Sequence, residues 1–226
     1  MTSLDHIYII VSQQFEADRI PTLRNMLREG GIPDERVTFF EPFYKGRDDI
    51  NIVRKMIKPP LIHHISEGAG FLYLSFYKLM RTFLASKHQT ILVLESDVLA
   101  QQPTEWPSQL DTVIRELQTL PDWRKSITFC GNGCGLEPSP ETRRGTQGIL
   151  YEMNSSKCCD SMIWQRDAIA DIVDHMLPMN GPIDIWLAQV WYPSSVAKSK
   201  QHKAYWIKPT IFMQGSQNGT YASNVQ

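Results

Sequence analysis

Continuous apolar runs alternate with amphipathic stretches along the first hundred residues of the chain. The runs His6–Val11, Val37–Phe40 and Thr90–Leu94 consist mainly of apolar and β-branched residues, which is typical of strands buried on both faces of a parallel sheet. Between these runs, apolar residues recur at helical spacing in residues 17–29 and 70–86. The order of strand, helix and strand predicts an α/β fold with a mostly parallel central sheet flanked by helices.

The second half of the chain continues this alternation in shorter elements. We expect helices in residues 103–121 and 167–177 and strands in residues 127–130, 158–164, 204–207 and 210–213. Residues 131–148 are rich in glycine and charged residues and form the longest expected loop. Because no internal repeat and no biased linker divides the chain, we predict a single domain spanning residues 1–226.

The balance of charge argues against some classes of partner. The 226 residues contain 23 lysines and arginines and 24 aspartates and glutamates, which gives a formal net charge of −1. Such a chain lacks the electrostatic field that attracts a nucleic-acid backbone or an anionic membrane, so we expect neither as a partner.

No stretch approaches the roughly 18 apolar residues of a membrane helix, so we expect no membrane span. Residues 1–6 lack the basic and apolar segments of a signal peptide, and we therefore expect a cytoplasmic protein.

Four cysteines, Cys130, Cys134, Cys158 and Cys159, allow two interpretations. Their number is low for a disulfide framework, and neighbouring cysteines rarely bond to each other. A zinc site would use all four, but their spacings do not form C-x-x-C pairs. We therefore favour reduced, mostly buried thiols over a zinc site.

The run Thr90–Leu94 ends in two carboxylates, Glu95 and Asp97, spaced i, i+2. On a strand this spacing points both side chains to one face, where they repel each other unless a cation lies between them. Oxygen ligands suit Mn²⁺ or Mg²⁺, which would bridge to a substrate diphosphate. We expect Asp97 to bind the metal directly and Glu95 to be a second ligand or to contact ribose and metal-bound water. His202 is a candidate to complete the metal coordination. The alternatives are that Glu95 and Asp97 form a solvated strand end and that His202 is a solvated loop residue.

In an open α/β sheet, ligands bind beyond the carboxyl ends of the strands. Val11, Ser12 and Glu41 follow the first two expected strands, so we predict that they lie near the base and ribose of a nucleotide. Ser96 lies at the same edge, and Arg47 would offset diphosphate charge if it is not simply a solvated loop cation. The chain has no G-x-G-x-x-G fingerprint, which argues against a dinucleotide cofactor.

Four short motifs follow one another along the chain. They are Gly68-Ala69-Gly70 with Ser75, the expected strand Ile91–Asp97, the turn Pro182-Ile183-Asp184-Ile185-Trp186 and the closing segment Pro209–Ser216. Their order resembles that of nucleotide-sugar glycosyltransferases with the GT-A fold, and it is most similar to family 25, the lipopolysaccharide and collagen-galactosyltransferase type. The resemblance covers residues 6–220. The chain reads Glu-Ser-Asp where the family usually has consecutive acidic residues.

The resemblance implies a single GT-A-like domain, with a nucleotide-binding half in residues 1–100 that ends in the Glu-x-Asp motif and an acceptor-binding half in residues 101–226. It implies a metal-dependent enzyme that moves a sugar from a nucleoside diphosphate, most readily a UDP-sugar, to a hydroxyl of a glycan or glycoprotein acceptor with inversion. Small transferases of this kind are also encoded by large DNA viruses that glycosylate their capsids. A viral source, with the host cytoplasm as location, would agree with the resemblance.

Inversion requires a carboxylate within hydrogen-bond reach of the acceptor hydroxyl. Asp184 stands between Ile183 and Ile185, which would partly desolvate it and raise its pKa, as a base needs. The same residue also suits the N-cap of a helix. Asp160 is the other candidate base, or else a contact to hydroxyls of the donor sugar.

Two other functions use the same elements. A sugar-nucleotide nucleotidyltransferase shares the strand order and the metal carboxylate, but it normally carries a glycine-rich loop after the first strand. This chain has Ser12-Gln13-Gln14-Phe15 at that point, which counts against it. A non-catalytic carbohydrate-binding or scaffold protein with a degenerate site is the other alternative, and the retained acidic pair argues against it.

Overall fold

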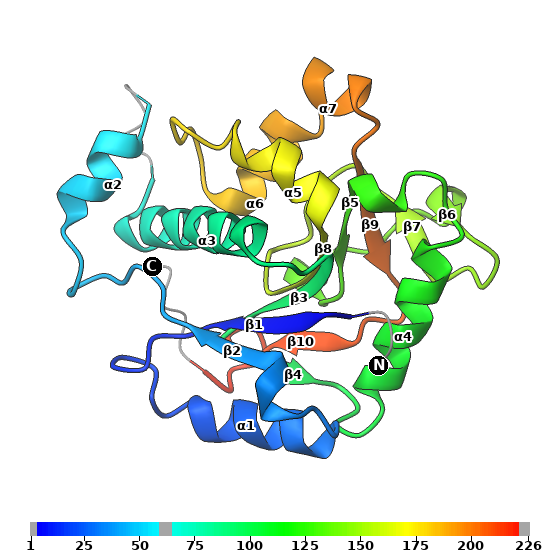
Figure 1. Cartoon of the computed structure of the whole chain (residues 1–226), viewed down its shortest axis with the longest axis horizontal. Helices are drawn as coiled ribbons and strands as arrows, with labels where there is room; N and C mark the ends of the chain where they lie inside the picture. Colours follow the sequence, from blue (N-terminus) through cyan, green and yellow to red (C-terminus); the bar gives the residue numbers. More distant parts are fainter. Residues whose placement is uncertain (1–3, 59–64, 222–226) are drawn as a thin grey trace.

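The computed structural model describes residues 4–58 and 65–221 and shows one large sheet flanked by helices (Figure 1). The strands are β1 His6–Ile10, β2 Val37–Phe40, β3 Thr90–Glu95, β4 Val98–Ala100, β5 Ser126–Phe129, β6 Arg143–Arg144, β7 Leu150–Glu152, β8 Ser161–Gln165, β9 Lys203–Ile207 and β10 Phe212–Gln214. The large sheet has eight strands in the order β2-β1-β3-β8-β5-β9-β7-β6, and β10 pairs with β4 in a separate two-stranded sheet.

Six of the eight strands in the large sheet run in one direction, and β7 and β8 run against them. β1 pairs in parallel with β2 and β3, and β5 pairs in parallel with β9. β8 lies antiparallel between β3 and β5. The predicted α/β fold with a mostly parallel central sheet flanked by helices is therefore confirmed.

The helices connect the strands and cover both faces of the sheet. They are α1 Ile20–Glu29, α2 Ile50–Met56, α3 Glu67–Ala85, α4 Trp106–Leu117, α5 Arg166–Val173, α6 Ile183–Trp186 with the π-helical turn η6 Leu187–Trp191, and α7 Ser195–Ser199. Short 3₁₀ turns occur at η1 Asp34–Arg36, η3 Trp123–Lys125, η4 Gly133–Gly135 and η5 Pro140–Thr142. None of the helices in the described residues is both long and apolar enough to cross a membrane.

Alternating residues of the central strands belong to two hydrophobic clusters, one on each face. Tyr8 and Ile10 of β1 pack with α3 and α5, whereas Ile7 and Ile9 pack with α1 and α4. In Figure 1, α3 and α5 lie on the opposite side of the sheet from α1. All five residues of β1 are buried, as the continuous apolar run predicted. The sheet is thus rigid up to its edge, where β1, β2 and β3 end.

Several boundaries differ from the sequence-based expectation for identifiable reasons. The strand expected from residue 158 begins at Ser161, because Cys158 has a positive φ of 50° that breaks the extended backbone. The strand expected in residues 210–213 is β10, and it pairs with β4 beside the acidic motif and not with the large sheet. The expected loop at 131–148 contains β6, which forms a hairpin with β7.

Candidate functional site

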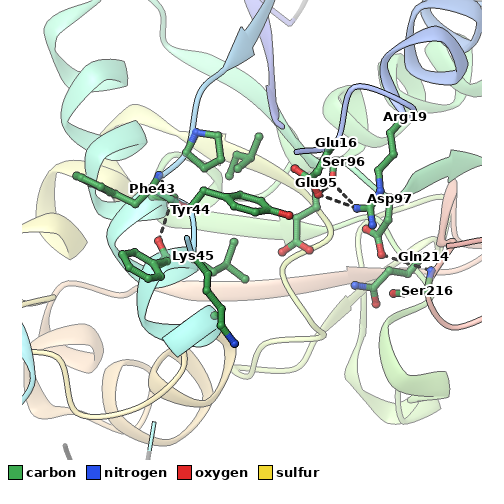
Figure 2. Close-up of a pocket in the computed structure, with 16 residues that line it drawn as sticks. Glu16, Arg19, Phe43, Tyr44, Lys45, Glu95, Ser96, Asp97, Gln214 and Ser216 are labelled. Atoms are coloured by element: carbon green, nitrogen blue, oxygen red, sulfur yellow. Dashed lines mark hydrogen bonds and ion pairs between the residues drawn. The ribbon is translucent and has the colours of Figure 1, made fainter. Parts of the chain in front are cut away.

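The carboxyl ends of β1, β2 and β3 meet at one edge of the sheet. Ile10 is in register with Phe40 on one side and with Glu95 on the other, so the residues that follow these strands converge. A cavity of about 100 Å³ opens at this edge (Figure 2). The polar and aromatic residues that line it include Glu16, Arg19, Tyr44, Lys45, Ser75, Glu95, Ser96, Asp97, Gln214 and Ser216.

A second cavity, of about 340 Å³, adjoins the first. The two share Leu72, Glu95, Gln214 and Ser216 in their walls, and Glu95 therefore faces both. The other walls of the second cavity come from α3, the turn before β8, the start of α6 and the tail, with Ala69, Cys158, Cys159, Pro182, Ile183, Asp184 and Gln217. The two cavities thus meet at the last residue of β3, and each is lined by residues from both 1–100 and 101–226.

Glu95 and Asp97 both line the first cavity, and Asp160 lies near both. The expected alternation along one strand does not place the pair, because β3 ends at Glu95 and Asp97 belongs to the turn before β4. The Glu95 backbone N–H donates to the Asp160 carbonyl oxygen at 2.8 Å. Burial raises the pKa of Glu95 well above its ordinary value, and the carboxylates of Asp97 and Asp160 raise it further. Burial likewise raises the pKa of Asp160 to about 7, and the charge of Asp97 adds to that increase.

Two buried carboxylate oxygens at this edge accept no hydrogen bond. Asp97 is 6% exposed and Asp160 is 1% exposed, and Oδ1 of each has no partner among the described residues. A buried carboxylate oxygen without a partner is costly unless a cation or a donor reaches it. Within the described residues, no group of three or more His, Cys, Asp or Glu side chains is arranged as a complete metal site. The donor set fits Mn²⁺ or Mg²⁺ held by one or two carboxylates and completed by phosphate oxygens and water.

The Ser96 side chain belongs to a buried hydrogen-bond network and is not placed as a direct ligand. The Arg19 guanidinium donates to Ser96 Oγ at 2.6 Å and to Glu16 Oε1 at 2.9 Å, and Ser96 Oγ donates to Glu16 Oε1 at 2.6 Å. The Ser12 backbone N–H donates to the other oxygen of Glu16 at 2.9 Å. Glu16 and Arg19, which sequence reasoning missed, therefore join the end of β1 to the acidic motif. Their i, i+3 spacing after the first strand was the available signal.

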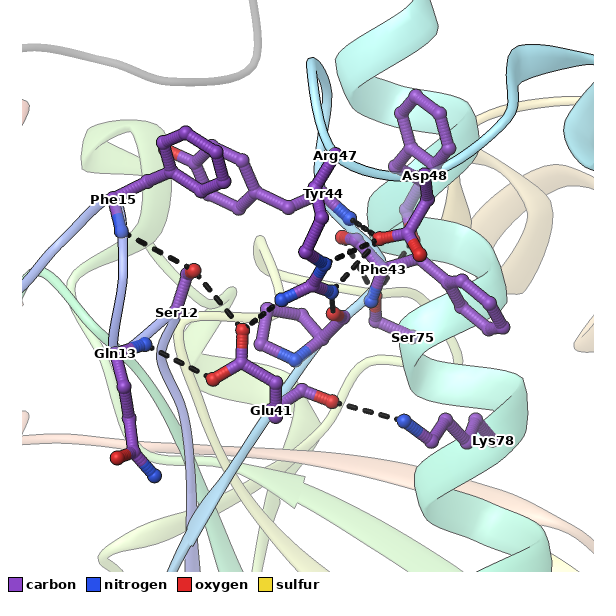
Figure 3. Close-up of polar contacts among 12 residues, drawn as sticks. Ser12, Gln13, Phe15, Glu41, Phe43, Tyr44, Arg47, Asp48, Ser75 and Lys78 are labelled. Atoms are coloured by element: carbon purple, nitrogen blue, oxygen red, sulfur yellow. Dashed lines mark hydrogen bonds and ion pairs between the residues drawn. The ribbon is translucent and has the colours of Figure 1, made fainter.

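Ser12, Glu41 and Arg47 are brought together, but they bind one another. Ser12 Oγ donates to Glu41 Oε1 and the Gln13 backbone N–H donates to Glu41 Oε2, each at 3.0 Å. The Arg47 guanidinium pairs with Glu41 and with Asp48, so its charge is already offset (Figure 3). Burial alone would raise the pKa of Glu41, but these donors lower it. The expected contacts of Glu41 with ribose and of Arg47 with diphosphate would require both residues to exchange existing partners.

Val11 lies at the expected strand end, but its side chain belongs to the core between the sheet and α1. Its backbone N–H donates to the Phe40 carbonyl oxygen at 3.2 Å, which extends the pairing of β1 with β2 by one residue. Val11 therefore helps to form the backbone at this edge of the sheet, but its side chain is not available to a ligand.

Asp184 lines the second cavity and is half-buried in the first turn of α6. The N-cap of this helix is Pro182, so the alternative assignment of Asp184 as the N-cap residue is wrong. Its Oδ1 accepts the Ile185 backbone N–H at 2.8 Å. No hydrogen bond from the described residues reaches its Oδ2. Asp160, the other candidate base, lies beneath the cavity walls and not in them.

His202 is not brought to the acidic edge. Its Nε2 lies 3.0 Å from Asp171 Oδ2, and its ring packs edge-on against Trp191. Burial lowers the pKa of His202, although Asp171 opposes that effect. His202 lines neither of the two cavities, so this structure does not support it as a metal ligand with Asp97. Cys130 and Cys159 are buried free thiols, and Cys134 has a side chain outside the described part of the structure.

The tail after β10 closes over the acidic motif. The Gly215 backbone N–H donates to the Asp97 carbonyl oxygen at 2.7 Å, and the Ser216 N–H approaches Asp97 Oδ2 at 3.4 Å. The Tyr221 ring lies 5.0 Å from the Arg19 guanidinium carbon. The segment after β10 is thus part of the site as far as Tyr221, and residues 222–226 lie outside the described residues.

Comparison of the sequence with models of known protein families and with curated proteins gave no match. Among solved structures, the chain is similar to mannose-1-phosphate geranyltransferase from Thermus thermophilus. The sequence identity is 11% and the TM-score 0.42, and the match covers 93% of this chain and 75% of that chain. A likeness of this size does not establish a shared activity or substrate.

Proposed function

We propose that this protein is a glycosyltransferase that takes a sugar from a nucleoside diphosphate and transfers it to a hydroxyl acceptor. The observation that carries the proposal is the meeting of two cavities at Glu95, with Asp97 in the wall of one and Asp184 in the wall of the other. Such a pair of adjoining cavities suits a reaction that must hold two substrates in contact. The resemblance to family 25 supports the same function.

The first cavity would hold the diphosphate. Lys45 is exposed at its wall, so its charge faces the space that the phosphates would occupy, whereas Arg19 in the same wall is paired with Glu16. Asp97, together with Asp160 or Glu95, would hold Mn²⁺ or Mg²⁺, whose positive charge offsets the charge that develops on the leaving diphosphate.

The second cavity would hold the acceptor. Asp184 Oδ1 is held by the Ile185 backbone N–H, which fixes the carboxylate and leaves Oδ2 for the acceptor hydroxyl. In the transfer step, the acceptor oxygen forms a bond to the anomeric carbon while the bond from that carbon to the diphosphate oxygen breaks. The acceptor proton passes to Asp184 Oδ2, and the nucleoside diphosphate leaves.

The test is to incubate the full chain with a panel of UDP-, GDP- and CDP-sugars, with and without Mn²⁺, and to measure release of the nucleoside diphosphate. We expect slow, metal-dependent release with at least one donor, and its loss in Asp97→Ala. A second arm supplies nucleoside triphosphates and sugar 1-phosphates and measures pyrophosphate, the product of a nucleotidyltransferase. Pyrophosphate without diphosphate release would replace the proposal with that alternative, and no turnover with no donor binding would favour a scaffold protein.

A further inference from the structure

Phe15 and Tyr44 form a stacked aromatic pair at the edge where β1 and β2 end. Their ring centroids are 4.7 Å apart and their planes differ by 4°. Phe15 lies in the segment after β1 and Tyr44 in the segment after β2, so the pair joins two loops that are far apart in sequence. Phe15 is 41% exposed. Core packing therefore does not account for the pair.

Hydrogen bonds hold the backbone of both residues in place, and each ring stacks on the other (Figure 3). Asp48 Oδ2 accepts the Tyr44 backbone N–H at 2.7 Å, and the Asp48 N–H donates back to the Tyr44 carbonyl oxygen at 3.0 Å. The Phe15 N–H donates to Ser12 Oγ at 3.4 Å, and Ser12 is in turn bound to Glu41. The pair is thus preorganised, which lowers the entropy lost when a ligand binds against it.

The two rings differ in their access to the first cavity. Tyr44 lines it and Phe15 does not. Because Phe15 covers one face of the Tyr44 ring, the opposite face and the edge are what Tyr44 offers to the cavity. Figure 2 shows the Tyr44 ring reaching across the cavity with its hydroxyl directed toward Glu95 and Glu16.

The first cavity combines an aromatic wall with charged groups. Tyr44 shares the lining with the cation of Lys45 and the carboxylate of Asp97. A nucleoside diphosphate carries the matching groups, a flat aromatic base and an anionic diphosphate that a cation or a metal would offset. Glu41 and Ser12, the predicted contacts for base and ribose, are bound to each other, whereas Phe15 covers only one face of the Tyr44 ring in the cavity wall.

We infer that the Phe15–Tyr44 pair is a nucleobase platform, on which the base of the donor stacks against the cavity side of Tyr44. The inference rests on the proposed function and specifies how that site holds its nucleotide. Stacking of a base on an aromatic side chain contributes about 1–3 kcal/mol, which corresponds to about 5- to 150-fold in affinity.

The experiment compares Tyr44→Leu, Tyr44→Phe and Phe15→Ala with the wild-type chain by calorimetry in the presence of Mn²⁺. The probes are UDP, GDP and CDP, with inorganic pyrophosphate as the probe that lacks a base. We expect Tyr44→Leu to weaken the tightest-binding nucleotide by about 5- to 150-fold and Tyr44→Phe to bind like wild type, because the π-face is kept. Phe15→Ala should weaken it by about 2- to 12-fold, the usual contribution of an aromatic pair. Pyrophosphate affinity should not change in any variant.

Phe39→Leu is the matched control. Phe39 lies on β2, packs beneath the Arg24 guanidinium at 4.9 Å and lines neither cavity, so its loss should leave nucleotide affinity unchanged. Saturation-transfer NMR on UDP provides a readout specific to stacking. The uracil H5 and H6 signals should be the strongest in the wild type and should fall relative to the ribose signals in Phe15→Ala, a surface change that does not threaten folding.

The outcomes separate the platform from the proposed function. If the wild type binds a nucleotide and both Tyr44→Leu and Phe15→Ala bind it equally well, the platform is overturned. The glycosyltransferase proposal would remain. A folded wild-type chain that binds none of the three nucleotides, judged by circular dichroism and calorimetry, would overturn both. Equal loss of nucleotide and pyrophosphate affinity in Tyr44→Leu would also reject stacking, because it would indicate general damage to the cavity.

Discussion

Gly131 lies in direct contact with the carboxylate of Asp160, which occupies the space that a side chain at position 131 would need. The contact explains why a glycine follows Cys130 at this point of the chain. It also connects the loop after β5 to the acidic edge, since Asp160 immediately precedes β8.

Gly131→Ala should therefore destabilise the protein. Its methyl group would overlap Oδ2 of Asp160, and overpacking of this kind in a buried site typically costs about 1–3 kcal/mol. Urea unfolding measures the change. Gly181→Ala is the control, because its added carbon would meet only Ile185 Cγ2, at 3.9 Å, and should leave stability unchanged. Equal stability of the two variants would show that Asp160 can move aside freely.

Asp97→Ala should abolish metal-dependent donor binding while the fold remains intact. Loss of a residue that only supports a metal ligand typically weakens metal affinity 10- to 100-fold, so we expect a loss of more than about 100-fold for Asp97 itself. Calorimetry with Mn²⁺ measures it. His202→Asn is the matched control and should bind Mn²⁺ like wild type, because His202 is paired with Asp171. Unchanged Mn²⁺ affinity in Asp97→Ala would refute the metal assignment.

The contribution of Asp160 to the stability of the metal-free protein should fall as the pH rises from about 4 to about 7. Asp160 has its pKa raised to about 7, above the ordinary value of about 3.9 for aspartate, so the folded state binds its proton more tightly than the unfolded state. Its ionisation therefore reduces stability across this window, by up to about 4 kcal/mol at about 1.4 kcal/mol per pH unit. The raised pKa of Glu95 acts in the same direction.

Asp160→Asn removes this titration and should flatten the profile. At pH 8 the metal-free variant should be more stable than wild type, whereas at pH 4 the two should be nearly equal, because the wild-type carboxyl is then neutral. Urea midpoints measured from pH 4 to pH 8 without metal provide the comparison. A variant whose profile runs parallel to that of the wild type would contradict the raised pKa.

Arg19→Ala should be strongly destabilising, because it leaves Glu16 buried without its cation. Removing one partner of a buried ion pair typically costs about 3–5 kcal/mol. Adding Glu16→Gln to Arg19→Ala should recover part of that loss, since the remaining buried group is then neutral. Arg24→Ala provides a control on α1, where Arg24 stacks on Phe39. If the double variant is no more stable than Arg19→Ala, the charge of Glu16 is not the source of the effect.

Asp184→Asn should lower turnover by about 10²- to 10⁴-fold, the usual contribution of a general base, with little change in donor affinity. The amide can still accept the Ile185 backbone N–H through its oxygen, so the first turn of α6 should persist. Steady-state rates and calorimetry with the same donor separate the two quantities. Asp174→Asn, at the exposed C-cap of α5, is the control. Parallel losses of turnover and donor affinity would instead assign Asp184 a structural role.

Much of the fold could be predicted because burial leaves a local pattern. The apolar runs at β1, β2 and β3 indicated strands covered on both faces, and the helical spacing indicated α1 and α3. Boundaries set by backbone conformation could not be predicted in this way. The positive φ of Cys158, for example, delays β8 to Ser161.

The sequence by itself determined the alternation of strands and helices and the convergence of Ser12, Glu41 and Glu95, because the ends of adjacent parallel strands must meet at one edge. Tertiary structure alone decided which of these side chains remain available. It paired Glu41 with Arg47 and His202 with Asp171, and it brought Arg19, Tyr44 and Ser216 into the first cavity. The physical reason is that burial and periodicity are local properties of the chain, whereas the partner of a polar group depends on segments far away in sequence.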